Sequence, residues 1–574
     1  MDATIKIGGE AGQGIQTVGD LIAHVCHREG LYLLAVNDFE SRIRGGHSFL
    51  QIRVSDAPTL APSHVVGILV ALNQRTFDLH QAEVPDDGVI LANDPENSRD
   101  DPRVLAMDID GLAKKAGGAI TANTVAAGAA LAVLGADFKI LEDILTRRFA
   151  AKGDAVTRMN VSAARLGYET VRDPARDSSR GQRPGFFPPL EARAPKGALI
   201  NGSRAAALGA LAADARLAAF YPMSPATGIM SAFDSFSDDF PIVTEQAEDE
   251  IAAMCMVIGA AYAGVRAMTA TSGGGFCLMT EALGLAGMAE IPVVIINAQR
   301  PGPATGLPTR TGQSDLLFVI HASQDEFPRF VFAPSTPCET FETMIRAFHL
   351  SDQYQVPAIV LMDQYLCDSV FVSERPLTPP KEIRRFITGD ESLDDPAAYK
   401  RFALTPDGVS PRILPCAGKA LLMATGNEHD EEGHISEDAE NRNRMVEKRL
   451  ARFREMKKEM SPPDTVHEGA DLMLISWGSS NGATREAMEI LNGMGVETGH
   501  MAFTDMWPFP GERAAEILSQ SRRVAVVEAN SQGQLGKLLR QETGAQTGKA
   551  VLKYDGRPFY PADILKGLGD WARP

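Results

Sequence analysis

The sequence contains few cysteines, and none of them lies close to another. The six cysteines are scattered along the 574 residues, at Cys26, Cys255, Cys277, Cys338, Cys367 and Cys416. Disulfide frameworks, zinc sites and iron–sulfur clusters need cysteines at short, regular spacings, and no C-x-x-C pair occurs. We therefore expect no disulfide framework, no metal site and no iron–sulfur cluster in this chain, and the reduced thiols of a cytoplasmic protein.

The sequence also lacks an excess of positive charge and a long apolar run. With 56 basic and 74 acidic residues the net charge is −18, and the isoelectric point is about 5.2. This balance argues against nucleic acid and against an anionic membrane surface as partners. The start "MDATIKIGGEAGQG" has no basic n-region, and no uncharged stretch reaches the roughly 18 residues of a membrane span. We expect neither a signal peptide nor a membrane segment.

A chain of this length is too long for one core, and short apolar strands alternate with helices along most of it. This pattern predicts an α/β protein of several domains, with doubly wound sheets. A stretch rich in proline, arginine and serine reads as a linker, and a charged stretch separates the last two α/β regions. The expected boundaries are 1–172, linker 173–195, 196–385, charged connecting segment 386–468, and 469–574.

The connecting segment contains two features of its own. Val446, Leu450, Phe453 and Met460 fall near one face of a charged helix, which is typical of a packing arm. The stretch "NEHDEEGH" at 427–434 brings together histidine and carboxylate groups that could bind a metal ion. Solvated acidic loops of this kind are common, and we predict no metal there.

Two loops of the first domain are rich in glycine. "GGEAGQG" at 8–14 follows a strand and opens a helix, so its N–H groups could face a phosphate. Its glycines do not follow the G-x-G-x-x-G order of dinucleotide folds, although Asp38 mimics the ribose-binding acid. A tight structural turn and a site for another phosphate or acyl carrier both remain open. In "ESRIRGGHSF", Arg42, Arg44 and His47 surround two glycines and suit an anion.

Three loops of the middle domain follow predicted strands. They are "FYPMSPATGIM" from 220, "TSGGGF" from 271 and "NAQRPGPATGLPTRTGQSDL" from 297. Ligands of open α/β sheets bind beyond the carboxyl ends of the strands, so these loops should converge. Arginine forks bind carboxylates bidentately, and Arg300 and Arg310 therefore indicate an anionic substrate. No P-loop, H-E-x-x-H or Ser-His-Asp arrangement stands out.

Four carboxylates crowd the start of "TEQAEDEIAAMCMVIGAAYAG", at Glu245, Glu248, Asp249 and Glu250. The helix dipole favours acids in a first turn, which explains some of them. It does not explain why Glu250 directly precedes a run that is apolar on every side, because a buried carboxylate is costly unless something binds it. Glu250 is therefore the first candidate for a ligand-binding acid, with Glu245 and Asp249 as alternatives.

Together these segments resemble the α subunit of 2-oxoacid:ferredoxin oxidoreductases with the γ domain fused in front. The resemblance is closest to α subunits of 2-oxoglutarate:ferredoxin oxidoreductase. "GGEAGQG" and "RGGHS" are similar to the γ domain, and "YPMSP" and "GPATGLPTRTGQSDL" to the α subunit; "GNEHDEEG" and "DMWPFP" also look like family segments. The resemblance implies that 196–385 is a pyrimidine-binding thiamine diphosphate domain and that 469–574 is similar to the transketolase C-terminal domain.

The resemblance implies oxidative decarboxylation of 2-oxoglutarate to succinyl-CoA and CO2 with reduction of ferredoxin, or the reverse reaction, CO2 fixation in a reductive tricarboxylic acid cycle. Glu250 would be the catalytic acid that hydrogen-bonds N1′ of the cofactor. Tyr221, Pro222, Thr271 and Gly274 would line the cofactor. Pyruvate or a broader range of 2-oxoacids remains an alternative, as does a non-catalytic dinucleotide-binding or scaffold subunit.

The resemblance also assigns the substrate contacts. Ser224, Arg300 and Thr309 match residues that contact the substrate, and Arg310 and His47 are expected at the distal carboxylate. Mg²⁺ would be shared with a β subunit that carries a [4Fe–4S] cluster, and coenzyme A would be the co-substrate. We expect a dimer of αβ heterodimers, inactive without its β subunits, with ferredoxin as the further partner.

Overall fold

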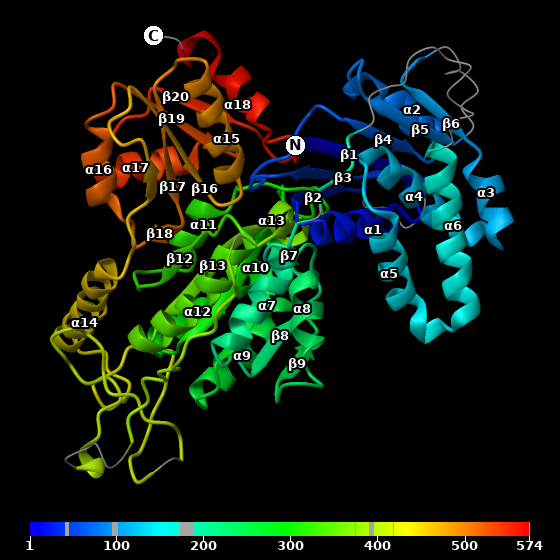
Figure 1. Cartoon of the computed structure of the whole chain (residues 1–574). Coiled ribbons are helices and arrows are strands. Elements are labelled where there is room, and N and C mark those ends of the chain that lie inside the picture. Colours follow the sequence, from blue (N-terminus) through cyan, green and yellow to red (C-terminus); the bar gives the residue numbers. More distant parts are fainter. Residues whose placement is uncertain are drawn as a thin grey trace. The chain divides into compact units, whose positions relative to one another are not determined.

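The computed structural model describes residues 1–40, 45–93, 101–172, 187–191, 193–373, 375–389, 395–416 and 418–572. It divides into two compact units. Unit 1 comprises Met1–Ile200 and Ser369–Pro376, and unit 2 comprises Asn201–Asp368 and Leu377–Pro574. Both units are built from strands and helices that alternate along the chain (Figure 1). The predicted α/β, multi-domain class is confirmed.

Unit 1 contains an eight-stranded sheet in the order β6-β5-β4-β1-β3-β2-β14-β7. The strands are β1 (Asp2–Ala11), β2 (Tyr32–Asp38), β3 (Gly45–Ser55), β4 (Ile68–Ala71), β5 (Val89–Asn93), β6 (Val104–Met107), β7 (Leu199–Asn201) and β14 (Val370–Val372). The central strand β1 runs parallel to β4 and antiparallel to β3. The helices are α1 (Ile15–Arg28), α2 (Gln74–His80), α3 (Ile109–Ala116), α4 (Ala122–Leu134), α5 (Phe138–Phe149) and α6 (Asp154–Arg172).

Helix α4 is almost entirely buried in the core of unit 1. Its small apolar residues allow α6 to pack closely against it. A Cβ on Gly128 would lie 2.1 Å from the Ala164 carbonyl oxygen, and one on Gly167 would lie 2.1 Å from the Val125 oxygen. The two backbones therefore touch through glycine. Across the described ranges no single helix is long and apolar enough to cross a membrane, although the bent pair Ile109–Ala116 and Ala119–Leu134 passes by length and composition.

The described end of the expected linker is attached to unit 1. The N–H groups of Phe187 and Leu190 donate to the carbonyl oxygens of Val133 and Gly135, at 3.1 and 3.0 Å. Both side chains pack against the core of the unit. Residues 173–186 and 192 of the predicted linker lie outside the described residues.

Unit 2 contains two sheets. The larger has the order β18-β12-β13-β11-β10-β8-β9 and the smaller the order β15-β17-β16-β19-β20. The larger sheet consists of β8 (Leu217–Phe220), β9 (Val243–Gln246), β10 (Ala267–Thr271), β11 (Val293–Gln299), β12 (Phe330–Phe332), β13 (Pro357–Asp363) and β18 (Asp505–Trp507). The smaller consists of β15 (Asp464–Val466), β16 (Leu472–Trp477), β17 (Thr498–Phe503), β19 (Arg523–Glu528) and β20 (Lys549–Leu552).

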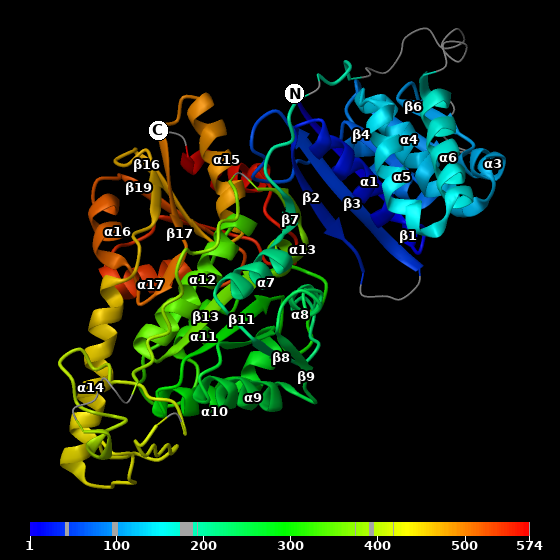
Figure 2. The same cartoon turned by 60° about the horizontal axis from the view of Figure 1, so that its bottom comes forward.

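Helices cover both faces of the larger sheet. Those before and between its strands are α7 (Gly202–Ala212), α8 (Thr227–Asp234), α9 (Glu250–Tyr262), α10 (Gly273–Met288), α11 (Leu316–His321), α12 (Pro337–Tyr354) and α13 (Gln364–Asp368). Alternate residues of β11 belong to different cores: Val293 and Ile295 pack with α9 and α10, and Val294 and Ile296 pack with α7 and α12. The two helix pairs thus lie on opposite faces (Figure 2).

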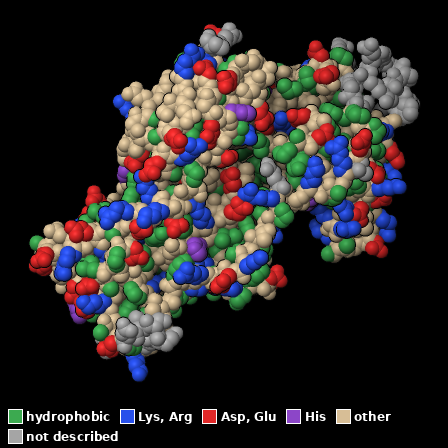
Figure 3. Space-filling model, turned by 60° about the vertical axis from the view of Figure 1, so that its left-hand side comes forward, with side chains coloured by type: hydrophobic (Ala, Val, Ile, Leu, Met, Phe, Trp, Pro, Cys, Tyr) green, Lys and Arg blue, Asp and Glu red, His purple; other side chains and the backbone are tan. Residues whose placement is uncertain are grey.

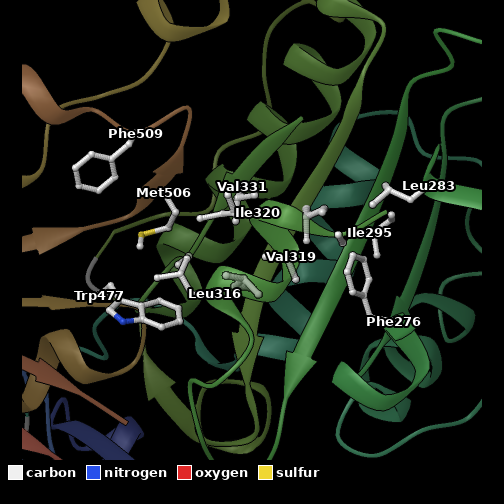
Figure 4. Close-up of a cluster of buried hydrophobic side chains, with 14 of the residues drawn as sticks. Phe276, Leu283, Ile295, Leu316, Val319, Ile320, Val331, Trp477, Met506 and Phe509 are labelled. Carbon is white, nitrogen blue, oxygen red and sulfur yellow. The ribbon is translucent and has the colours of Figure 1, made fainter. Parts of the chain in front are cut away.

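The two sheets of unit 2 share one hydrophobic core. Phe276 and Ile295 of the larger sheet region belong to the same buried cluster as Trp477 at the end of β16 (Figure 4). Strand β18 also leaves the C-terminal region and pairs antiparallel with β12, with Val331 opposite Trp507. Asn201–Asp368 and Leu377–Pro574 therefore form one compact unit, which contains most of the expected domain 196–385 and all of 386–468 and 469–574, while Ser369–Pro376 belongs to unit 1.

The helices of the C-terminal part are α14 (Ala439–Lys458), α15 (Ser480–Gly493), α16 (Gly511–Leu518), α17 (Gln534–Thr543) and α18 (Pro561–Leu568). Only part of the expected apolar face of helix α14 packs: Phe453 lies against Trp507 with ring centroids 5.5 Å apart and Met460 is 8% exposed, whereas Leu450 is 43% exposed. The helix also packs through buried cations: Lys448 and Arg452 form ion pairs with the buried Glu290 at 2.5 and 2.7 Å. Burial of charge is costly unless it is paired, so this cluster fixes where the arm attaches.

Lys and Arg side chains are interspersed with Asp and Glu side chains over the face shown in Figure 3. That face carries no patch of one sign, despite the net charge of −18.

Candidate functional site

The candidate site of unit 2 lies at the carboxyl ends of three parallel strands. β10 pairs with β8 and with β11, with Thr271 of β10 opposite Asn297 of β11. The loops that leave these strands carry the three motifs that the sequence predicted to converge. The carboxyl edge of a parallel sheet is the usual place for a ligand.

Glu250 is the buried acid among the four carboxylates. It is the first residue of α9 and only 2% exposed, and its Oε1 atom is buried without a hydrogen-bond partner within the described chain. Asp249 caps the helix, accepting the Ala252 N–H at 2.8 Å, while Glu245 and Glu248 are exposed. A buried carboxylate oxygen without a donor is costly, so the site is built to receive one.

The glycine turn at the start of α10 makes room for this carboxylate. A Cβ on Gly275 would lie 2.1 Å from Thr271 Oγ1 and 2.4 Å from Glu250 Oε1, so only glycine fits at this position. Thr271 is fully buried, whereas Gly274 is exposed and has only the Ala304 carbonyl oxygen within 4 Å of an added Cβ. Thr271 and the turn thus lie directly against Glu250.

The loop after β8 joins the same place through Met223. Its sulfur lies 2.8 Å from Ser272 Oγ, and Arg300 donates from Nη1 to the Ser224 carbonyl oxygen at 2.7 Å. Burial lowers the pKa of Arg300, which shows that its guanidinium is partly desolvated. Contacts therefore run from Glu250 through the glycine turn and Met223 to Ser224 and Arg300. Tyr221 and Pro222 of this loop are exposed.

Thr309 and Arg310 lie further along the loop that follows β11. The backbone N–H of Thr311 donates to the Gly556 carbonyl oxygen at 3.3 Å, and a Cβ on Gly556 would lie 3.0 Å from Arg310 Cβ. The C-terminal region of unit 2 thus holds this part of the loop. The side chains of Thr309 and Arg310 are half-buried.

Two further acids near these loops escaped sequence reasoning. Asp315 accepts a hydrogen bond from Asn297 Nδ2 at 3.1 Å and lies against the glycine turn, where burial raises its pKa to about 6. Asp363, at the end of β13, accepts from the Ser479 hydroxyl and the Leu366 N–H, and burial raises its pKa to about 6. Neither has a distinctive sequence pattern, although Asp315 lies in the quoted "TGQSDL".

The residues around Glu250 fit the aminopyrimidine of thiamine diphosphate. The required features are a desolvated carboxylate that accepts a hydrogen bond from a ring nitrogen and a backbone that lets a flat ring approach. Glu250 Oε1 supplies the first, and the exposed backbone at Gly274, which has no Cβ, supplies the second.

Unit 1 places its glycine loop beside His47. Gly14 has a left-handed backbone at the start of α1, and a Cβ there would lie 1.8 Å from Asn123 Nδ2, so this glycine is required by the turn itself. A Cβ on Gly8 would lie 2.4 Å from Thr76 Cγ2 and 3.3 Å from His47 Cε1. Arg42 and Arg44, which were also expected to attract an anion, lie outside the described residues.

His47 does not have the charge that its expected role at a distal carboxylate requires. Burial, together with repulsion from His80 and Arg75, lowers the pKa of His47 to about 4, so the imidazole is neutral near pH 7. Its Nε2 atom already forms a hydrogen bond with His80 Nε2 at 2.8 Å. We no longer assign His47 to the carboxylate.

The acidic stretch 427–434 forms a structural turn. His429 Nδ1 lies 2.9 Å from the Asn427 carbonyl oxygen, and Asp430 Oδ1 accepts the N–H groups of Glu432, Gly433 and His434. In the described ranges, no three side chains of His, Cys, Asp or Glu gather where they could bind a metal ion.

Three protein-family models match the chain. Residues 4–170 match pyruvate ferredoxin/flavodoxin oxidoreductase, residues 208–448 match the thiamine diphosphate-binding domain of pyruvate flavodoxin/ferredoxin oxidoreductase, and residues 470–564 match core domain II of pyruvate:ferredoxin oxidoreductase. Glu250 and the three loops lie within the second match.

Relatives match over nearly the full length. A 2-oxoacid:ferredoxin oxidoreductase subunit alpha from Sulfolobus sp is 32% identical over 98% of this chain and 96% of its own length. The 2-oxoglutarate oxidoreductase subunit KorA of Mycobacterium tuberculosis is 29% identical over 98% and 90%. The solved structure of 2-oxoglutarate:ferredoxin oxidoreductase from Magnetococcus marinus, with 2-oxoglutarate, coenzyme A and succinyl-CoA bound, is 30% identical, covers all of both chains and has a TM-score of 0.92. With three matching family models and full-length relatives of this identity, the chain belongs to the 2-oxoacid:ferredoxin oxidoreductase family.

Proposed function

We propose that the chain is the α subunit, with a fused γ domain, of a 2-oxoglutarate:ferredoxin oxidoreductase that forms succinyl-CoA and CO2 and reduces ferredoxin. The observation that carries the proposal is the Oε1 atom of Glu250, which is buried without a donor inside the segment that matches the thiamine diphosphate-binding model. When bound, thiamine diphosphate supplies the nucleophilic carbon that 2-oxoacid decarboxylation requires.

In this proposal Glu250 accepts a hydrogen bond from the protonated ring nitrogen N1′ of the aminopyrimidine. Its burial at 2% exposure strengthens that bond, because water does not compete for the carboxylate. Thr271, the turn at Gly274, Tyr221 and Pro222 would line the bound cofactor. Glu250 thereby holds the proton that the cofactor needs for activation.

The substrate lies at the other end of the same contacts. Arg300, already held against the Ser224 carbonyl oxygen, presents a partly desolvated guanidinium to the 2-oxo carboxylate, and Thr309 adds a hydroxyl. Arg310 pairs with the distal carboxylate of 2-oxoglutarate. A cation that pairs with this second carboxylate would favour 2-oxoglutarate over pyruvate, because pyruvate has no charge at that position.

The names of the relatives support 2-oxoglutarate without excluding wider specificity. The relatives from M. tuberculosis and M. marinus are named for 2-oxoglutarate, whereas the one from Sulfolobus is named for 2-oxoacids. A broad-specificity 2-oxoacid enzyme is therefore the second candidate.

A β subunit would complete the active enzyme. It would bind the Mg²⁺–diphosphate end of the cofactor and carry a [4Fe–4S] cluster, for which the scattered cysteines here offer no spacing. Helices α9 and α10 present exposed apolar side chains beside the Glu250 site, at Ile251 (49%), Met256 (41%) and Leu278 (48%). Exposed apolar side chains of this kind mark a protein–protein interface, and we assign this surface to contact with the β subunit in a dimer of αβ heterodimers. The electron donor would decide whether the enzyme instead carboxylates succinyl-CoA.

The experiment is to co-express the chain with its partner and compare kcat/KM for 2-oxoglutarate and pyruvate with coenzyme A and ferredoxin. A preference of at least about 100-fold for 2-oxoglutarate is expected if Arg310 pairs with the second carboxylate. Arg310→Gln should remove that preference while leaving the pyruvate rate unchanged. Equal efficiency in the wild type would favour the broad-specificity enzyme, and a purified complex that oxidises no 2-oxoacid would reject the proposal.

A further inference from the structure

Unit 1 contains a connected row of ionisable side chains, here called the His47 relay: His47, His80, Glu83 and Lys6. His47 Nε2 lies 2.8 Å from His80 Nε2, and His80 Nδ1 lies 2.7 Å from Glu83 Oε1. Lys6 forms an ion pair with the other oxygen of Glu83. The residues come from β3, α2, the 3₁₀ turn Gln81–Glu83 and β1, so only the tertiary fold brings them together.

The hydrogen bonds fix the tautomers of both histidines. A carboxylate only accepts, so His80 Nδ1 carries its hydrogen toward Glu83, and the Nε2 atom of neutral His80 is then an acceptor. His47 must therefore donate from Nε2 to His80 Nε2, so the Nδ1 atom of neutral His47 carries no hydrogen and has a free lone pair. That Nδ1 atom is buried and has no hydrogen-bond partner among the described residues. His47 Nδ1 can therefore accept a hydrogen bond or a proton from a ligand.

The relay is buried at the carboxyl end of β1. Lys6 is 4% and His80 7% exposed, and the Phe49 ring packs against both, with its centroid 4.4 Å from Lys6 Nζ and 5.2 Å from the His80 ring. Gly8 lacks the Cβ that would press on the His47 ring. One end of the relay is thus enclosed by the core, and the other reaches the strand ends, where ligands of α/β sheets bind.

The charges around His47 disfavour a proton that stays on it. Arg75 and Lys6 repel the imidazolium and Asp38 attracts it, and the net pKa lies below the ordinary range. Burial opposes ionisation of Glu83, but the hydrogen bond from His80 and the charge of Lys6 lower its pKa overall. A proton is therefore poorly held on His47, and the Glu83 carboxylate, 2.7 Å from His80 Nδ1, provides a negative charge at the other end of the histidine pair.

We propose that the His47 relay is the base that removes the proton from a thiol acyl acceptor bound by unit 1. The S–H bond breaks and an N–H bond forms at His47 Nδ1, leaving a thiolate. His47 passes its Nε2 proton to His80 Nε2, and the resulting imidazolium remains hydrogen-bonded to Glu83. One proton moves from sulfur to His80, and no oxidant or reductant is consumed.

This inference rests on the proposed function, which supplies the reason for a thiol. Of the reactants in that reaction, the 2-oxoacid dianion offers His47 no acidic proton. The thiol must lose one for a thioester to form, and a thiolate is the reactive nucleophile. His80 and Glu83 are positioning residues, since they act on the thiol only through His47.

The test uses the complete enzyme, a 2-oxoacid that it oxidises, and coenzyme A as the thiol. Thioester formation is measured after the oxoacid has reacted, and reduction of a one-electron dye is measured separately without thiol. His47→Gln should slow thioester formation by about 10²–10⁴-fold, the usual contribution of a general base, and leave the thiol-independent reduction within twofold. Imidazole in solution should partly restore His47→Ala.

Glu83→Gln provides a readout that a merely structural role would not change. Without the carboxylate the relay is a weaker base, so the acidic limb of the pH profile for thioester formation should move to lower pH while the plateau falls. Asp78→Asn is the matched control on α2, because Asp78 is exposed and contacts Gln74 rather than the relay. It should leave both half-reactions unchanged.

The proposal is overturned if His47→Gln forms thioester within threefold of the wild type, or if it slows both half-reactions equally. It is also overturned if Glu83→Gln leaves the pH profile in place. Because any oxidised 2-oxoacid serves in this assay, loss of the 2-oxoglutarate preference would reject the proposed specificity without deciding the relay.

Discussion

Two glutamates of unit 2 are equally buried and have opposite surroundings. Glu250 begins α9 and Glu290 follows the end of α10, and both are 2% exposed. Glu290 is ion-paired with Lys448 and Arg452, with Arg401 at 3.8 Å, and these cations hold its pKa well below the ordinary range although burial opposes them. Among the described residues no cation pairs with Glu250, and its Oε1 atom is buried without a hydrogen-bond donor. Oε2 of Glu290 also lacks a hydrogen-bond donor, but it faces the Arg452 guanidinium at 2.7 Å.

We expect this difference to separate a structural acid from a ligand-binding one. A buried charge that is surrounded by cations joins parts of the fold, and here it attaches α14 to the end of α10. A buried carboxylate that lacks a donor is costly to the folded protein and is retained where a ligand provides the donor. Burial alone would have ranked the two residues together.

The largest expected effect is on catalysis. Glu250→Gln keeps the shape of the side chain but removes the acceptor charge, so kcat of the assembled enzyme should fall by about 10²–10⁴-fold. Folding should be unaffected, because the carboxylate oxygen has no donor to lose in the protein. Steady-state assays with saturating cofactor, alongside thermal unfolding, measure both. Full activity in this variant would remove the distinction between the two glutamates.

Glu290→Gln should produce the converse result. Three buried cations would lose their counter-charge, which typically costs about 3–5 kcal/mol of folding free energy. Urea unfolding of the purified chain measures this loss, and Glu281→Gln, an exposed acid on α10, is the control. The fraction that remains folded should retain its specific activity; a selective loss of turnover without loss of stability would contradict the structural role.

The glycine turn tests how tightly Glu250 is held. In Gly275→Ala the new Cβ would displace the carboxylate, and a misplacement of about 1 Å costs roughly 100-fold in kcat/KM. Gly259→Ala in α9 is the control, since nothing lies within 4 Å of its added Cβ, and alanine there should stabilise the helix slightly. Gly274→Ala examines the cofactor contact predicted for Gly274: it should weaken thiamine diphosphate binding, and unchanged affinity would remove Gly274 from the site.

The smallest effect concerns His500, a buried histidine whose charged form is disfavoured by desolvation. It lies 2.7 Å from Ser476 Oγ, and burial lowers its pKa to about 3 from an ordinary 6.5. The unfolded state then binds the proton more readily, so stability falls as the pH drops below 6.5, by about 2 kcal/mol at pH 5. His500→Gln should flatten this part of the pH dependence of Tm; an unchanged slope would assign it to other groups.

Sequence patterns predicted part of the site, because they report local surroundings. The apolar run after Glu250 indicated that this acid enters a core, and the three loops after strands were predicted to converge. Asp249 and Glu245 were the alternatives to Glu250. That Asp249 caps α9 and that Glu245 is exposed could be seen only once the position of the helix was known. Likewise, the apolar spacing on α14 did not reveal that Lys448 and Arg452 form its buried face.

By itself, the sequence determined the α/β class, the absence of cysteine spacings for a cluster, and the motifs that carry the family resemblance, since these depend on composition and short-range order. Only the tertiary structure decided which buried acid is surrounded by cations, that two expected domains share one core, and that His47 is joined through His80 to Glu83. Residues that are distant along the chain bury each ionisable group and supply its hydrogen-bond partners. These surroundings set the free-energy cost of its charge and its protonation state.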